Sequence, residues 1–403
     1  MESRNIIDDP VDQLHSTRNN RNLRLRRLSG SRGGDDKLDN AVRSTRSRRP
    51  AKRRRALGRN KQAREARRWK IPLVLVVILL SLYALHPTES NIAHPLIFLS
   101  YKARYTADTL AAPEYGKGPR DIAFVGFYAL VLFFAREFAM QEVLRPLAVS
   151  LGITSRRKQG RFNEQAYVAL YTGLVGPLGL YVMYRSPTWY FSTAGMYAAY
   201  PHTTHAAAAK FYYLVQAAFW AQQALVMVLG LETRRRDFRE LVVHHVVTVS
   251  LIALSYRFHF TMMGVLVYVT HDISDFFLAT SKSLNYIDSP AQGPYFALCI
   301  AVWVYLRHYI NLKILASIPT EFRTVGPYIL DWEAGQYKCE VSSVIAFVLL
   351  AALQALNLFW LCCLLRNAYR FVVLGVAKDD REDDGEDNEN DHHGAADAKG
   401  ERA

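Results

Sequence analysis

The sequence has few of the cysteines and histidine motifs that stabilise secreted domains or bind metal ions. It contains four cysteines, whose spacing fits neither a disulfide framework nor a metal site: Cys299, Cys339, Cys362 and Cys363. No Asn-X-Ser/Thr sequon occurs, so the sequence offers no glycosylation marker of topology. The apolar segments also lack the HxxxH boxes in which membrane di-iron enzymes gather their histidines. These absences argue against a disulfide-rich secreted protein and against di-iron chemistry.

Charge is scarce in the middle of the chain and concentrated at its ends. Half of the 403 residues are hydrophobic. Residues 1–70 hold 22 Lys and Arg against 8 Asp and Glu, a surplus of 14 that equals the net charge of the whole protein. The basic character therefore belongs to a tail, and the remainder of the chain is predicted to be a membrane-embedded domain.

Both termini are predicted to be disordered. Residues 1–69 are Arg-rich without an apolar period, and in the acidic tail 371–403 residues 379–403 are strongly acidic and free of aromatic residues. We expect no cleavable signal peptide, because no apolar core follows the first few residues. The basic run at 48–68 resembles a nuclear-localisation or nucleic-acid-binding segment, but a span starts directly after it. We therefore favour a juxtamembrane stretch that contacts anionic lipid, and we expect no nucleic-acid partner. Ser29, in Arg24-x-Arg26-x-x-Ser29, fits the preference of basophilic kinases and is a candidate regulatory phosphosite.

Hydropathy predicts an all-α polytopic membrane protein with about eight transmembrane helices. The predicted spans are 71–86, 121–141, 164–184, 211–231, 240–257, 262–281, 293–314 and 341–366. Basic residues gather in the tail and in 145–161, 234–239 and 366–378. If the N-terminus is cytosolic and the chain crosses eight times, all four groups lie on the cytosolic side, as do both termini.

This topology divides the chain into four parts. Residues 1–69 form a basic cytosolic tail, and 70–115 a first membrane anchor with a lumenal segment. Residues 116–370 form the catalytic membrane domain, and 371–403 an acidic cytosolic tail.

Five ionisable residues lie within the two neighbouring spans 240–257 and 262–281. They are His244, His245, His271, Asp272 and Asp275. Such side chains are costly inside a membrane, so they usually face a cavity and have a function. A tight antiparallel hairpin around Phe258 and His259 would set His245 level with Asp272, roughly 20 Å from the turn. The spacing thus predicts one cluster of proton acceptors and carboxylates.

The sequence around these residues resembles the Lag motif of ceramide synthases, which share the TLC domain. The resemblance rests on DFRELVVHHVVTVSLIALSYRFHFT (237–261) and HDISDFFLATSKSLNY (271–286). It extends upstream to RFNEQ, SPTWYF, YPH and YYLVQAAFWAQQ, and downstream to YLRHY and TVGP. The motifs look most like the fungal branch and cover about 117–370.

The resemblance implies a TLC-type helical bundle that encloses a lipid cavity in the endoplasmic reticulum membrane. It implies transfer of an acyl chain from acyl-CoA, as co-substrate, to the amine of a sphingoid base. The fungal branch suggests a very-long-chain acyl-CoA with dihydrosphingosine or phytosphingosine, and the 315–340 loop is where the family is expected to tune chain length. It also suggests a small single-span regulatory subunit, and a homodimer is a further candidate assembly.

The sequence leaves two mechanisms open for this reaction. His244 or His245 could remove the proton of the amine, with Asp272 or Asp275 holding the imidazole tautomer. One imidazole could instead attack the thioester and form an acyl-histidine intermediate.

Further residues are candidates for substrate binding. Thr248 lies one turn from His244 and could bond to the site, or back to the carbonyl four residues before it. Tyr268 could donate to the developing oxyanion or simply pack. The CoA phosphates need a cytosolic binder, and the candidates are Arg234, Arg235, Arg236, Arg239 and Lys282.

Two rival readings remain. Two histidines and the carboxylates could hold one divalent ion, but no third ligand box appears, so we expect neither a metal nor a bound cofactor. A non-enzymatic lipid-binding or lipid-transfer role, which also occurs among TLC-domain proteins, is the alternative to catalysis.

Overall fold

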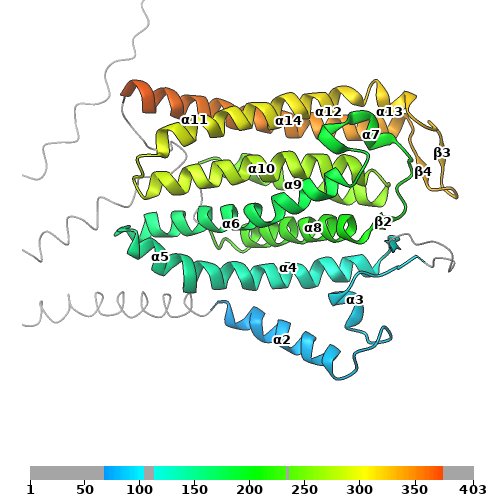
Figure 1. Cartoon of the computed structure of the whole chain (residues 1–403), viewed down its shortest axis with the longest axis horizontal. Coiled ribbons are helices and arrows are strands. Elements are labelled where there is room, and N and C mark those ends of the chain that lie inside the picture. The colour runs from blue at the N-terminus through cyan, green and yellow to red at the C-terminus, as the bar shows by residue number, and fades with distance from the viewer. Residues whose placement is uncertain (1–67, 104–112, 233–235, 375–403) are drawn as a thin grey trace, which may run out of the picture. The chain divides into compact units, whose positions relative to one another are not determined.

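The computed structural model describes residues 68–103, 113–232 and 236–374, which all belong to one compact unit, Ala66–Ala403. Long helices run side by side along it, and short helices and two-residue strands gather at one end (Figure 1). The prediction of an all-α architecture is confirmed. Ser29 and most of both predicted tails lie outside the described residues, so those assignments stay predictions, as does the division into four parts.

Eight helices make up the body of the bundle. They are α2 (Lys70–Ala84), α4 (Arg120–Phe138), α6 (Arg156–Tyr184), α8 (Ala207–Val228), α9 (Phe238–Arg257), α10 (Thr261–Tyr286), α11 (Gln292–Trp303) and α14 (Glu340–Leu374). Two of them continue through a π-helical segment. The first continues α4 through η1 (Ala139–Leu144) into α5 (Arg145–Ser150), and the second continues α11 through η3 (Val304–Ile310) into α12 (Asn311–Ser317) and then α13 (Glu321–Thr324).

The remaining elements are short and connect the long helices. They are α3 (His94–Ile97), β1 (Glu114–Tyr115), η2 (Trp189–Phe191), α7 (Thr193–Tyr197), β2 (His205–Ala206), β3 (Leu330–Asp331) and β4 (Gln336–Tyr337). The strands pair antiparallel as β1 with β2 and β3 with β4.

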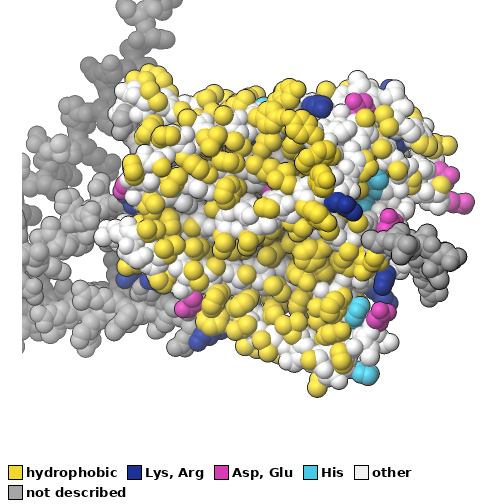
Figure 2. All heavy atoms as spheres, in the orientation of Figure 1, with side chains coloured by type: hydrophobic (Ala, Val, Ile, Leu, Met, Phe, Trp, Pro, Cys, Tyr) yellow, Lys and Arg dark blue, Asp and Glu magenta, His cyan; other side chains and the backbone are white. Residues whose placement is uncertain are grey.

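Six helical stretches of the described residues are long and apolar enough to cross a membrane: Arg120–Ser150, Arg156–Tyr184, Phe238–Arg257, Thr261–Tyr286, Gln292–Thr324 and Glu340–Leu374. Each contains most or all of a predicted span. Figure 2 shows hydrophobic side chains over most of one face of the bundle, as lipid contact requires. The first and fourth predicted spans correspond to α2, which has only 15 residues, and α8, which has 22 but is less apolar. The number of eight crossings therefore stays a prediction.

Helix α10 packs mainly against α6, with fewer contacts to α9. Small residues on α6 allow this close approach. A Cβ atom at Gly173 would lie 3.1 Å from the ring of Phe276 on α10, and one at Gly179 would lie 2.6 Å from the hydroxyl of Tyr212 on α8. The predicted hairpin paired α10 with α9 alone. The structure shows that α6 is the main packing partner of α10.

The connection between α9 and α10 marks one end of the bundle, which we call the turn end. His259 has a left-handed backbone conformation there, with φ of 64°. Neighbouring elements hold this residue: the His202 ring donates to its carbonyl oxygen at 3.1 Å, and Lys117 Nζ lies 3.3 Å from its ring nitrogen. Its ring also stacks on Tyr337 of β4.

A buried ion pair fixes three helices at the turn end. Lys210 of α8 and Asp121 of α4 are 2.7 Å apart and almost fully buried. Lys210 also donates to the carbonyl oxygens of Ser100 and Gly116, and Asp121 accepts from the hydroxyl of Tyr256 on α9 at 2.8 Å. These bonds satisfy both charges, as a buried ion pair requires.

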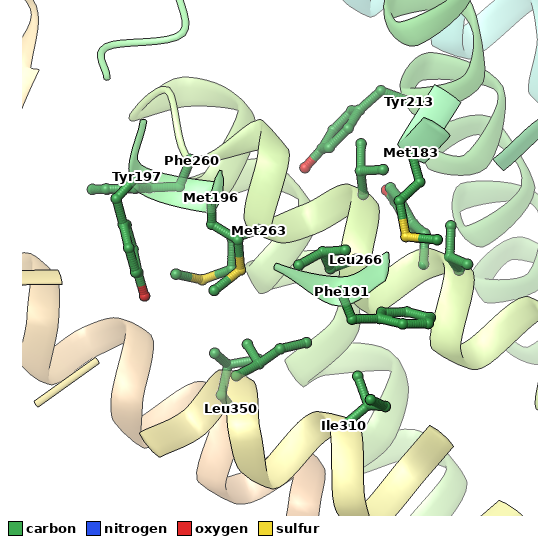
Figure 3. Close-up of a cluster of buried hydrophobic side chains, with 14 of the residues drawn as sticks. Met183, Phe191, Met196, Tyr197, Tyr213, Phe260, Met263, Leu266, Ile310 and Leu350 are labelled. Atoms are coloured by element: carbon green, nitrogen blue, oxygen red, sulfur yellow. The ribbon is translucent and has the colours of Figure 1, made fainter. Parts of the chain in front are cut away.

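The hydrophobic core next to the turn end joins α6, α7, α8, α10, η3 and α14. Figure 3 shows Met196, Tyr197, Met263 and Phe260 at its centre, with Leu350 and Ile310 closing it from the side of α14 and η3. Methionine fills irregular gaps and adapts its shape readily. This region is therefore packed but deformable.

Candidate active site

Helix α9 places the two adjacent histidines in the interior of the bundle. His244 and His245 are 5% and 8% exposed, and their ring centroids are 5.8 Å apart. Two tryptophans flank His244, edge to face: Trp220 of α8 at 5.3 Å and Trp360 of α14 at 5.1 Å. Trp220 also contacts His245, with centroids 5.7 Å apart. The imidazoles are thus held between aromatic walls.

Backbone carbonyls orient two of the three imidazoles. His245 donates from Nδ1 to the Leu241 carbonyl at 2.8 Å, and His271 donates from Nδ1 to the Val267 carbonyl at 2.8 Å. Each ring therefore keeps an unprotonated Nε2 as its acceptor atom. The prediction that Asp272 or Asp275 holds the tautomer concerned His244 or His245; at His245 the Leu241 carbonyl, one helical turn earlier, takes that place.

The carboxylates of α10 have other partners. Asp272 accepts hydrogen bonds from the Tyr212 hydroxyl at 2.8 Å and from the Gln216 amide, both on α8. Asp275 accepts from Arg307 at 2.5 Å. The carboxylates are therefore bonded to α8 and η3, and among the described residues no hydrogen bond joins them to the histidines of α9.

Arg307 is a site residue that the sequence analysis missed. It is 2% exposed, donates from Nε to Ser274 Oγ at 2.6 Å and from Nη1 to Asn357 Oδ1 at 3.1 Å, and lies 4.2 Å from the ring centroid of Trp303. It stands in the π-helical segment η3, and such segments often mark functional sites. The signal that could have found it is its charge within a predicted span, in the motif YLRHY.

Two cavities meet at the histidines. A wide cavity of about 1660 Å³, including its open mouth, is lined by His244, His245, Asp272, Asp275 and Arg307 together with Asp237, Glu232 and Glu164. A narrow cavity of about 510 Å³ runs from there toward the turn end. Mostly apolar residues line it, and His271, Thr248 and Tyr268 stand at its inner end.

The hydroxyl of Thr248 has no hydrogen-bond partner among the described residues. The bond back to the carbonyl four residues earlier is therefore not formed. His271 Nε2 and His244 Nδ1 likewise have no partner within the described part of the chain. Buried polar atoms are nearly always paired, so these atoms are available to a bound molecule.

Of the basic residues predicted to bind CoA, those that the structure describes line neither cavity, and the others lie outside the described residues. Arg236 and Arg239 are exposed near the start of α9, Lys282 is partly buried on α10, and none of the three lines either cavity. Arg234 and Arg235 fall outside the described residues, so their role stays a prediction. In the described ranges no group of three or more His, Cys, Asp or Glu is arranged to hold a metal ion.

Comparison with known proteins identifies the family. A family model described as the TLC domain matches residues 161–366, a range that contains every residue lining the two cavities. The sphingosine N-acyltransferase-like protein FUM17 of Gibberella moniliformis is 56% identical over 318 residues, which are 78% of this chain and 82% of that protein. The chain belongs to the TLC-domain ceramide synthase family.

Two further members of the ceramide synthase family come from yeasts. Ceramide synthase LAG1 of Saccharomyces cerevisiae is 47% identical over 321 residues, covering 79% of this chain and 77% of its own length. Sphingosine N-acyltransferase lac1 of Schizosaccharomyces pombe is 43% identical over 328 residues, covering 81% and 84%. The predicted resemblance to fungal ceramide synthases is confirmed, and the protein is a multi-pass membrane acyltransferase.

Proposed function

We propose that this protein is a ceramide synthase of the endoplasmic reticulum membrane. It transfers a fatty acyl group from acyl-CoA to the amine of a sphingoid base and releases CoA. The observation that carries the proposal is that two unlike cavities, one apolar and narrow and the other wide and charged, share Trp220, whose ring lies against His244. An apolar chain and a polar head can thus be brought together at an imidazole.

The narrow cavity takes the acyl chain. Seven residues of α9 separate Thr248 at its inner end from Ser255 at its far end, which is about 10 Å at the helical rise per residue. Met263 and Gly264 of α10 close that far end. A very-long-chain acyl group is longer than this, so it requires Met263 and the core behind it to repack, which flexible methionine side chains permit.

The wide cavity takes the amine. Five carboxylates and one arginine line it, and two of the carboxylates, Glu164 and Glu232, are already paired with Arg161 and Arg136. Asp272 receives its hydrogen bonds from neutral groups, so a protonated amine is attracted to it. The CoA phosphates stay at the cytosolic mouth, near Arg236, Arg239 and the neighbouring arginines.

His244 accepts the proton of the amine. It lines the wide cavity, and Trp220 and Trp360 fix its ring. The freed amine nitrogen attacks the acyl carbon, the carbon–sulfur bond breaks, and the thiol of CoA leaves with a proton. Release of CoA in a rapid-mixing experiment without sphingoid base would instead establish the acyl-histidine route.

Replacement of the histidines tests the proposal. We expect His244→Gln to lower amide formation about 100-fold or more in purified protein, as loss of a general base does. His308→Gln is the matched control, because His308 bonds to Gln354 and lines neither cavity. Full acylation by His244→Gln/His245→Gln at unchanged expression would refute the role of these histidines, whereas absence of acylation by the unaltered protein would favour the lipid-binding alternative.

Four assays test the finer proposals. A panel of acyl-CoA lengths should show an optimum above eighteen carbons, and an optimum at sixteen or eighteen would contradict the very-long-chain preference. Tags on both termini should be accessible from the cytosol. Activity of the purified chain alone would contradict a need for a single-span regulatory subunit, and light scattering in detergent distinguishes a monomer from a homodimer.

A further inference from the structure

Among the described residues, Trp220 alone lines both the wide and the narrow cavity. It stands on α8, and its ring lies against His244 and His245. On the other side of the boundary, His271 and Thr248 line the narrow cavity. The indole is therefore the side chain that borders the reaction centre from both spaces.

The two spaces differ in what they admit. The wide cavity has an open mouth and carries Asp272, Asp275 and Arg307 on its wall, so it holds water. The narrow cavity exposes almost only apolar surface, formed by residues such as Leu251, Val267 and Leu353. The polar lining of the wide cavity and the apolar lining of the narrow cavity thus meet at the ring of Trp220.

Water in the wide cavity is a competitor of the amine. If a water molecule reaches the acyl carbon, its oxygen bonds to that carbon and the carbon–sulfur bond breaks. The products are a free fatty acid and CoA, which carries the second proton of the water on its sulfur. The amine reacts in preference to water only if water is kept away from the acyl carbonyl.

We propose that Trp220 is a positioning residue that keeps water of the wide cavity from the acyl carbonyl, so that the acyl group passes to the amine instead of being hydrolysed. This inference rests on the proposed acyl transfer. The ring lines both cavities, and the His244 imidazole lies between it and Trp360. Removal of the indole joins the two cavities.

The test is the ratio of free fatty acid to amide formed by purified protein with acyl-CoA and sphingoid base in ¹⁸O-labelled water. We expect Trp220→Ala to raise this ratio several-fold, with ¹⁸O in the carboxylate. Trp220→Phe keeps an aromatic ring at the boundary and should raise it less. Phe219→Ala is the matched control, because Phe219 neighbours Trp220 and lines only the wide cavity.

Each result decides the inference. A ratio that rises for Trp220→Ala and stays at the wild-type value for Phe219→Ala supports it. An unchanged ratio in Trp220→Ala and Trp220→Phe, whatever the overall rate, overturns it while leaving acyl transfer intact. Absence of amide with the unaltered protein overturns the proposed function and this inference together. If Trp220→Ala does not fold, the ratio for Trp220→Phe decides alone.

Discussion

The guanidinium of Arg307 joins its own segment η3 to two other helices. It reaches Ser274 and Asp275 on α10 and Asn357 on α14 from its own segment η3. An arginine fork is preorganised for several bonds at once, which a lysine ammonium cannot reproduce. The residue therefore sets the position of Asp275 relative to the histidines.

Replacement of Arg307 should cost both stability and activity. We expect Arg307→Gln to lower the free energy of unfolding by about 1–3 kcal/mol, because it leaves the partly buried Asp275 without its cation. Arg307→Lys should lose less stability but most of the acyl transfer. Thermal unfolding in detergent and the amide assay measure the two effects. The double variant Arg307→Gln/Asp275→Asn should regain part of the stability, and no regain would contradict the pairing argument.

The five ionisable residues that the sequence singled out all line the cavities, but the sequence did not reveal their partners. His271 and Asp275 are four residues apart on α10, yet His271 lines the narrow cavity and Asp275 the wide one. One helical turn along the axis is enough to cross the boundary between the cavities. That boundary is made by Trp220, a residue of another helix, so no spacing within α10 could reveal it.

Glycines of α6 decide how closely the neighbouring helices approach. A Cβ at Gly179 would lie 2.6 Å from the hydroxyl of Tyr212, the group that donates to Asp272, whereas one at Gly176 would meet nothing within 4 Å. We expect Gly179→Ala to destabilise by about 1–3 kcal/mol, the usual effect of overpacking, and to lower acyl transfer by displacing Tyr212. Gly176→Ala should leave both unchanged, and equal effects of the two variants in unfolding and activity assays would refute this.

The π-helical segment η3 places Arg307 toward the site. Such a segment contains one residue more than a regular helix over the same length. Deletion of Tyr305, whose side chain is exposed, should restore a regular helix and turn Arg307 away from Asp275. We expect the deletion to abolish amide formation and Tyr305→Ala to retain it, as measured in the same assay at matched expression. Activity of the deletion variant would show that the irregular segment is dispensable.

At the scale of the molecule, the turn end should be sensitive to pH. Burial lowers the pKa of Lys117 from 10.5 to about 7; Asp121 opposes this shift, and the charge of Lys210 adds to it. Between pH 7 and 10.5 the unfolded chain therefore binds more protons at this residue than the folded chain does. The free energy of unfolding should therefore rise with pH between pH 7 and 10.5. Below pH 7 Lys117 is protonated in both states and causes no further change with pH.

Lys117→Met tests the assignment. The variant should show a smaller rise in melting temperature between pH 7 and pH 9 than the unaltered protein, and Lys102→Met, an exposed lysine at the same end, should not. An undiminished rise in Lys117→Met would mean that other groups cause it. His259, whose pKa burial lowers to about 4, acts at lower pH and does not interfere.

The overall architecture was largely predictable because lipid imposes simple rules on sequence. All eight predicted spans appear as helices, and six of these are long and apolar enough to cross a membrane, since a buried backbone in lipid must satisfy its own hydrogen bonds. The main packing partner of α10 did not follow, because it depends on which small residues of α6 face it, as Gly173 does toward Phe276.

Helix α2 packs against α4, and neither of these helices supplies a residue to the cavities. The sequence of α2 can thus change, or α2 can be exchanged for another membrane anchor, without altering the residues that line the cavities. Selection for the identity of the product should therefore act on the helices that follow α4.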